Sequence, residues 1–332
     1  TGAQGADSIT GGSGNDVIDG GSGNDTLNAG AGADSITGGA GADSIAAGEG
    51  NDTIVGADAS DTILGSNGTD TLQVSSSYTP DTDANLEDLE NLVVAGNSSA
   101  VTVNLSNQAG EAFNLTASNQ GDTITTADGA DTISGGSGND VIDGGSGNDT
   151  LSAGNGADTI TGGAGVDSVD GGAGVDVLVF ASAGELAGDA TVIGGSESDT
   201  IRVESGSAAL ELADSDFAKV TGVETLALDG TGTQAVTLGT NTDAAFESGI
   251  RITTQATAAS LNLQGAASTR SIDATATGQS DTLVGGTVAD TLTGGAGADS
   301  ITGGAGADSI SAGEGNDTIV GAQDDALLDG GN

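Results

Sequence analysis

The chain has 332 residues, of which 49 are Asp or Glu, 4 are Lys or Arg and 61 are Gly, and its formal net charge is −45. This charge excludes the basic surface that nucleic acid or an anionic membrane requires, and no apolar run is long enough to span a membrane. The absence of Cys and His excludes disulfides, thiolate or imidazole metal sites and the common hydrolase triads.

A nine-residue unit repeats through most of the chain, and Gly11–Asn28 contains two copies, GGSGNDVID and GGSGNDTLN. Each copy has Gly at positions 1, 2 and 4, Asp at position 6 and a large aliphatic residue at position 8. High charge with few aromatics resembles disorder, but disorder does not require an aliphatic residue at every ninth position. We therefore expect a fold that depends on bound metal.

The unit divides into a turn and a strand. Positions 7 to 9 favour a short strand that points the eighth side chain to one face. Positions 1 to 6 are expected to turn, because Gly supplies the positive φ angles of tight turns. Two units then form one flattened coil, and coils stack about 4.8 Å apart, so residues eighteen apart lie one above another.

The first repeat block is expected at residues 2–73, in eight units. Its seventh unit is degenerate, with Ala59 in place of the third glycine, so its loop should be weaker. Its sixth-position acids are Asp7, Asp16, Asp25, Asp34, Asp43, Asp52, Asp61 and Asp70.

A first spacer is expected at residues 74–116. Alternating aliphatic residues at Val101, Val103 and Leu105 predict a strand. The acidic stretch Asp81–Glu90 has two open interpretations, a solvated surface loop or an additional ion site.

The second block is expected at residues 117–202, where the last unit is degenerate, and a second spacer follows at residues 203–275. Leu89–Leu92 matches Val223–Leu226, so the two spacers are interpreted as versions of one module. The acids of this block are Asp122, Asp131, Asp140, Asp149, Asp158, Asp167, Asp176 and Asp199.

All four cations of the chain lie in or beside the second spacer: Arg202, Lys219, Arg251 and Arg270. They either pair with nearby acids or dock onto an anionic neighbour.

The third block is expected at residues 276–332, and its register breaks where Ala326 replaces Asp. Its acids are Asp281, Asp290, Asp299, Asp308 and Asp317. Solenoid ends need caps. Neither end of the chain begins or ends with one, so we expect it to be a piece of a longer protein.

Stacking places the sixth-position carboxylates in ladders on the two edges of the coil. Like charges at about 5 Å, close to the spacing of stacked strands, repel one another unless a cation lies between them. Carboxylates together with inward carbonyls form an all-oxygen shell, which suits Ca²⁺ better than Mg²⁺. All 21 acids named above are therefore candidate Ca²⁺ ligands, and many Ca²⁺ ions are the expected cofactors.

GGSGNDVID and GGAGADSIT resemble the RTX (repeats-in-toxin) nonapeptide, GGxGxDxUx. The resemblance implies an all-β fold, a right-handed parallel β-roll or β-solenoid, with metal-poor β-helical spacers. It also implies that each Ca²⁺ is held by sixth-position Asp side chains and loop carbonyls, and that the chain is exported through a type I channel. The spacer phrases FAKVTGVETLALDG and DLENLVV are similar to segments of bacterial surface-layer and adhesin-like proteins.

From this resemblance we expect a secreted, extracellular structural protein of a bacterial surface layer (S-layer), without enzymatic activity. Partners are expected to be other copies of the chain or cell-surface polysaccharide, with no nucleic acid and no membrane span. Two alternatives remain open: the stalk of a large RTX adhesin, and the repeat tail of a secreted toxin or hydrolase.

Overall fold

The structure is a computed structural model that describes residues 1–95, 99–254, 260–277, 279–321 and 325–331. The chain forms two compact units, Thr1–Asp167 and Ser168–Asn332, which are described separately. In both units the strands pair in parallel and each strand lies beside one from a neighbouring coil. The expected all-β parallel solenoid is therefore confirmed.

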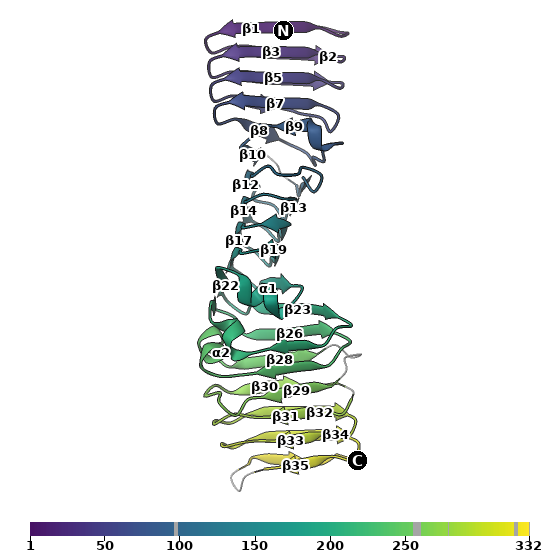
Figure 1. The fold of residues 1–332 in the computed structure, drawn as a ribbon, viewed down its shortest axis with the longest axis vertical. Helices are drawn as coiled ribbons and strands as arrows, with labels where there is room; N and C mark the ends of the chain where they lie inside the picture. Colours follow the sequence, from purple (N-terminus) through teal and green to yellow (C-terminus); the bar gives the residue numbers. More distant parts are fainter. Residues whose placement is uncertain (96–98, 255–259, 278, 322–324, 332) are drawn as a thin grey trace. The chain divides into compact units, whose positions relative to one another are not determined.

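The first unit has two main faces. One carries β1 (Ser8–Ser13), β3 (Thr26–Ala31), β5 (Ser44–Glu49), β7 (Thr62–Asn67) and β9 (Leu86–Glu87). The other carries β2 (Val17–Ser22), β4 (Ser35–Ala40), β6 (Thr53–Val55), β8 (Thr71–Val74), β10 (Asn91–Val94), β12 (Asn114–Thr116), β14 (Thr132–Ser137) and β17 (Thr150–Asn155). Figure 1 shows β1, β3, β5 and β7 stacked one over another.

Later coils of this unit continue in β11 (Thr102–Asn104), β13 (Thr123–Thr125), β15 (Val141–Asp143) and β18 (Thr159–Thr161), with a short pair β16 (Ser146–Gly147) and β19 (Ala164–Gly165). A 3-10 turn, η1 (Asp83–Asn85), precedes β9. The strand expected around Val101–Leu105 is present as β11, and the side chains of Val101, Val103 and Leu105 are buried.

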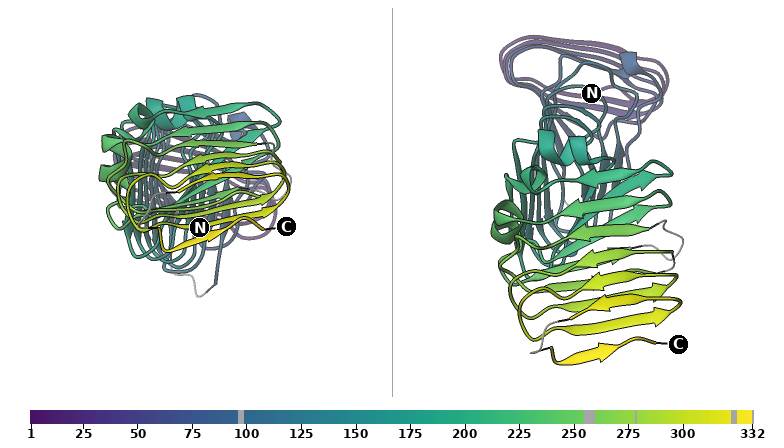
Figure 2. Two further views of the ribbon diagram at one scale, coloured as in Figure 1. Left: turned by 90° about the horizontal axis from the view of Figure 1, so that it is seen from below. Right: turned by 60° about the horizontal axis from the view of Figure 1, so that its bottom comes forward.

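The second unit is also built from stacked parallel strands (Figure 2). One row of strands holds β20 (Ser168–Ala173), β22 (Thr191–Ser196) and β25 (Val220–Thr221). A second row holds β24 (Leu210–Leu212), β27 (Gln234–Thr237), β29 (Leu261–Gln264), β31 (Thr282–Val284), β33 (Ser300–Thr302) and β35 (Thr318–Val320). A third row holds β21 (Val177–Phe180), β23 (Thr200–Gly206), β26 (Thr225–Gly230), β28 (Ile250–Thr254), β30 (Ile272–Thr275), β32 (Thr291–Ala296), β34 (Ser309–Glu314) and β36 (Leu327–Asp329).

Short helices, which the sequence pattern did not predict, interrupt the second unit. They are α1 (Ala183–Gly188), η2 (Asp214–Phe217) and α2 (Thr240–Ala245), and η2 contacts both α1 and α2. Phe217, the last residue of η2, and Phe246, at the end of α2, are buried and pack edge to face with ring centroids 5.8 Å apart, and so supply an aromatic contact between these elements. Within the described residues, no helix is long and apolar enough to cross a membrane.

Many strands are longer than the sequence analysis expected. The strand β2 covers positions 7 to 9 of one unit and positions 1 to 3 of the next, so the glycine pair lies in the strand and not in the turn. The pairing of Gly21 with Gly39 and of Ser22 with Ala40 shows why, because the parallel ladder continues through these residues. In these longer strands the expectation that all of the first six positions turn is therefore wrong, and the turn is confined to positions 4 to 6; after shorter strands such as β15 and β18 the glycine pair lies outside the strand.

The core is the row of eighth-position side chains. Ile36, Ile54 and Leu72 align across β4, β6 and β8, and each is completely buried. Because positions 6, 8 and 1 point to the same face of an extended chain, the sixth-position Asp points inward with the core. The same alternation that builds the apolar core therefore brings carboxylates into the interior.

Candidate metal centre

The sixth-position carboxylates form hydrogen-bonded rows. The backbone N–H of Asp25 donates to Oδ1 of Asp43 at 2.8 Å, and that of Asp34 donates to Oδ1 of Asp52 at the same distance. In the first unit such bonds join Asp7, Asp25, Asp43 and Asp61; Asp16, Asp34, Asp52 and Asp70; Asp122, Asp140 and Asp158; and Asp131, Asp149 and Asp167. In the second unit they join Asp176 with Asp199; Asp281, Asp299 and Asp317; and Asp290 with Asp308.

Every candidate ligand of the sequence analysis thus lies in one of these rows. All are buried except Asp7, Asp16 and Asp317, which are half-buried. Asp199 of the degenerate unit keeps its place although it lies 23 residues from Asp176.

The second carboxylate oxygen of many of these residues is left without a partner. In the described part of the chain, Oδ2 is buried and accepts no hydrogen bond in Asp16, Asp25, Asp34, Asp43, Asp52, Asp70, Asp140, Asp149, Asp199, Asp299 and Asp317. A buried anionic oxygen without a partner costs substantial free energy. The repeated occurrence of the same unpartnered atom indicates a site for a positively charged ligand.

Backbone carbonyls meet these oxygens at the first glycine of several units. A methyl group built on Gly20 would lie 2.5 Å from Oδ2 of Asp25 and 2.5 Å from the carbonyl oxygen of Gly38, in the next coil. At Gly144 the corresponding distances are 2.7 Å to Oδ2 of Asp149 and 2.8 Å to the carbonyl oxygen of Gly162. Each glycine therefore keeps open a small space between a carboxylate and a carbonyl oxygen from adjacent coils.

The donor set of this space fits Ca²⁺. Among the described residues, no group of three or more Asp, Glu, His or Cys side chains surrounds one point, so carbonyl oxygens must complete the shell. Carboxylate and carbonyl oxygens are the ligands that Ca²⁺ prefers, and its flexible coordination tolerates such a mixed shell. A bound cation would supply charge neutralisation, and the chain's own residues would align the two oxygens.

Burial raises the pKa of several aspartates in the rows. Burial is the main cause that raises the pKa of Asp149 to about 7 and that of Asp140 to about 6, and neighbouring carboxylates act in the same direction. Burial likewise raises the pKa of Asp281 and of Asp199 to about 6. Without a cation these groups keep their protons to a higher pH than an ordinary aspartate, so metal binding near pH 6 should release protons.

In the first loop of the chain the backbone N–H of Ala3 donates to Oδ2 of Asp7 at 2.9 Å, and three further loops, which have no fourth-position glycine, satisfy their carboxylate in the same way. A backbone N–H of the same loop donates to Oδ2, from Asp58 to Asp61 at 2.8 Å, from Ser118 to Asp122 at 2.8 Å and from Gly286 to Asp290 at 2.6 Å. In these three loops Ala59, Gln120 and Val288 replace the fourth-position glycine. Because an internal donor occupies Oδ2, these three positions should bind Ca²⁺ more weakly than the regular loops.

Sequence reasoning missed two acids that belong to the rows. Glu90 accepts the N–H of Asp70 at 2.8 Å, and Glu224 accepts the N–H of Asp199 at 2.9 Å. They lie 20 and 25 residues from their donors, so a search at a fixed period of 18 passes over them. The signal that could have identified them was the match between Leu89–Leu92 and Val223–Leu226.

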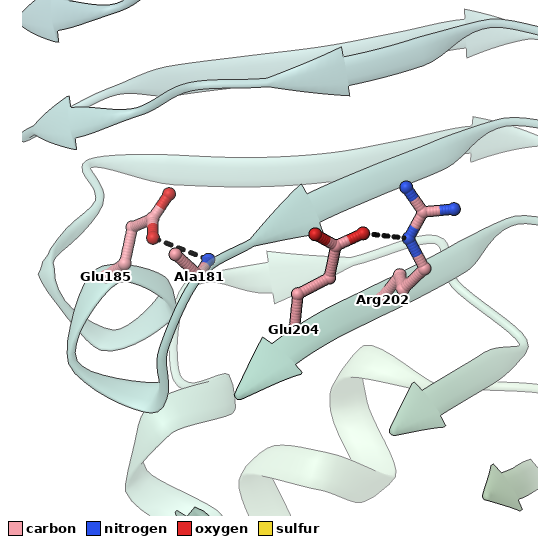
Figure 3. Close-up of polar contacts among 4 residues, drawn as sticks. All are labelled: Ala181, Glu185, Arg202 and Glu204. Atoms are coloured by element: carbon pink, nitrogen blue, oxygen red, sulfur yellow. Dashed lines mark hydrogen bonds and ion pairs between the residues drawn. The ribbon is translucent and has the colours of Figure 1, made fainter. Parts of the chain in front are cut away.

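The few cations are used within the chain. Arg202 forms an ion pair with Glu204 at 2.9 Å (Figure 3), and Arg251 lies 3.4 Å from Asp273. Figure 3 also shows Glu185 accepting the backbone N–H of Ala181 at the start of α1.

The other two cations bind backbone carbonyl oxygens. Lys219 donates to Asp189 at 2.5 Å, and Arg270 donates to Asp243 at 3.2 Å. Pairing with nearby acids thus holds for Arg202 and Arg251, whereas Lys219 and Arg270 donate to the backbone.

A carboxylate in the middle of a row provides a direct test. Asp43→Asn keeps an oxygen that can accept the N–H of Asp25 but removes one anionic ligand. We expect the midpoint Ca²⁺ concentration for β formation, followed by circular dichroism, to rise about tenfold, or about 1.4 kcal/mol. Asp19→Asn, at an exposed position of β2, is the matched control and should leave the midpoint unchanged. Equal midpoints for both variants would contradict the assignment of Asp43 as a ligand.

The fold and the rows of inward carboxylates define a class of protein, a parallel β-solenoid with a repeated acidic edge. The profile of the RTX calcium-binding nonapeptide repeat matches residues 1–36, 37–72, 116–151, 143–178, 275–310, 284–319 and 294–328. These segments include more than half of the chain, and the chain belongs to the family of RTX calcium-binding repeat proteins. A comparison with curated proteins finds no match.

Proposed function

We propose that this chain is a secreted structural protein whose solenoid folds and becomes rigid when Ca²⁺ binds its aspartate rows. The observation that carries the proposal is the recurrent unpartnered Oδ2, as in Asp25 and Asp149, beside a carbonyl oxygen of the next coil. Ca²⁺ between these oxygens converts a repulsive interior into a coordinated one. The net charge of −45 supports the same dependence, because a compact chain with this charge repels itself unless cations bind.

The energetics of the same rows support the proposed secretion. Cytosolic Ca²⁺ is scarce, so the chain stays unfolded there and can pass through a narrow export channel. Extracellular Ca²⁺ then drives folding by mass action, because it binds the folded state and not the unfolded one. The chain has no His or Cys for common nucleophilic catalysis, and the 21 repeat Asp residues are committed to the rows, so the proposed role is not enzymatic.

The proposed location is a bacterial surface layer, in which copies of the chain assemble with one another or with cell-surface polysaccharide. Two long spacers between repeat blocks support a structural role over a simple repeat tail. Electron microscopy of the chain with and without millimolar Ca²⁺ tests this location. Ordered two-dimensional arrays that form only with Ca²⁺ are the expected result, whereas isolated particles would contradict the surface-layer assignment and favour the adhesin stalk.

A further inference from the structure

The same three-residue segment follows each of the first two repeat blocks. It consists of Asp88, Leu89 and Glu90 after the first block, and of Gly222, Val223 and Glu224 after the second. The first residue of each segment is left-handed, with φ of 50° and 64° respectively. The second is a buried aliphatic residue, 3% and 0% exposed. The two segments therefore share a left-handed first residue, a buried aliphatic second residue and a glutamate at the third position.

The glutamate of each segment takes the place of the next aspartate in a row. Asp52 donates its N–H to Oδ1 of Asp70 at 2.9 Å, and Asp70 in turn donates to Oε2 of Glu90 at 2.8 Å. In the second unit, Asp176 donates to Oδ1 of Asp199 at 2.8 Å, and Asp199 donates to Oε2 of Glu224. Each row thus ends on a glutamate that makes the same contact as a repeat aspartate.

The last aspartate of each row also keeps an unpartnered oxygen. Asp70 and Asp199 are both 0% exposed, and Oδ2 of each is buried without a hydrogen-bond partner. A regular loop would place the carbonyl oxygen of the following repeat beside this atom. A methyl group built on Gly65 would lie 2.7 Å from Oδ2 of Asp70 and against the carbonyl oxygen of Asp88. One built on Gly194 would meet the carbonyl oxygen of Gly222 and the Cβ of Asp199.

The spacer segment therefore supplies both groups that a further repeat coil would supply, a carbonyl oxygen from its first residue and a carboxylate from its third. We propose that Glu90 and Glu224 each complete an additional Ca²⁺ site, one at the C-terminal end of each of the first two repeat blocks. This inference rests on the proposed function, since it requires that the aspartate rows bind Ca²⁺.

Substitution of the two glutamates in the full chain tests the proposal. Glu90→Gln and Glu224→Gln keep an oxygen that can accept the N–H of the preceding aspartate but remove the anionic ligand. Glu87→Gln and Glu211→Gln change exposed glutamates on β9 and β24 and are the matched controls. The number of Ca²⁺ ions bound per chain is measured by equilibrium dialysis, and β content by circular dichroism.

Each site variant is expected to bind one ion fewer, or to bind that ion at least tenfold more weakly, and both controls should retain the unsubstituted count. An unchanged count and affinity in both site variants would overturn the proposal and leave the glutamates as hydrogen-bonding caps. If the unsubstituted chain binds no Ca²⁺, the proposed function itself fails, which is a separate outcome.

A measurement on the unsubstituted chain tests the proposal even if a substituted chain fails to fold. Crystals of the unsubstituted chain grown with Ca²⁺ should place an ion within about 2.3–2.6 Å of the Glu90 or Glu224 carboxylate. Ions in the regular loops but none at either glutamate would overturn the proposal.

Discussion

Chelation of Ca²⁺ at neutral pH is expected to convert the far-ultraviolet circular dichroism of this chain from a β spectrum to that of a coil. At a free Ca²⁺ concentration 100 times Kd, each site contributes about 2.7 kcal/mol to the folded state. A few such sites already equal the usual stability of a domain, about 5–15 kcal/mol. The effect should therefore be complete, and restoring Ca²⁺ should reverse it. Mg²⁺ at the same concentration is the control, and should restore little β structure because it keeps its water ligands.

Tyr78, the only tyrosine of the chain, supplies a second probe of the same transition. It is 3% exposed, and burial raises the pKa of its hydroxyl above the usual value of about 10. Because the folded-state pKa is the higher one, its contribution to stability is complete below pH 10 and is lost as the pH rises further. With Ca²⁺ at pH 11, tyrosinate absorbance should stay low and should rise on chelation. A chelated chain that remains β-rich and melts cooperatively would contradict metal-driven folding.

Gly30→Ala is expected to cause a large loss of stability in the first block. Gly30 has φ of 110°, and a methyl group there would lie 3.0 Å from the carbonyl carbon of Gly12 and press on its oxygen. The contact lies between β1 and β3, which pair through these two glycines. The coils would have to separate, so we expect a loss of more than about 4 kcal/mol, measured as a fall in melting temperature at fixed Ca²⁺.

Gly56→Ala separates this steric effect from backbone strain. Gly56 also has positive φ, 71°, but a methyl group there meets nothing within 4 Å. The control should therefore lose only the conformational penalty of about 1–2 kcal/mol. Similar losses in both variants would show that close stacking of the coils is not what requires glycine at position 30.

The nine-residue period was sufficient to predict the parts of the fold that depend on periodicity alone. An aliphatic residue at every ninth position can be buried in only one way in stacked coils, which is why Ile36, Ile54 and Leu72 align. The same argument placed Asp25 above Asp43, because both positions follow from the period of 18. The prediction required no knowledge of individual contacts.

Features that depend on local geometry could not be predicted in this way. In the longer strands the glycine pair lies in the strand because backbone pairing with the next coil continues through it. The turn propensity of glycine alone gives no information on that pairing. The helices α1 and α2 lie where the nine-residue period is interrupted, so the repeat pattern cannot predict them. Glu90 escaped detection because an inserted stretch moved it out of register, although its longer side chain still reaches Asp70.

The central claim is that Ca²⁺ lies between Oδ2 of a repeat aspartate and a carbonyl oxygen of the next coil. X-ray diffraction from crystals grown with Ca²⁺ tests it most directly, through the anomalous signal of the bound ions. The account predicts an ion within about 2.3–2.6 Å of Oδ2 of Asp25 and of the carbonyl oxygen of Gly38. A folded solenoid in millimolar Ca²⁺ with only water at that position would contradict it.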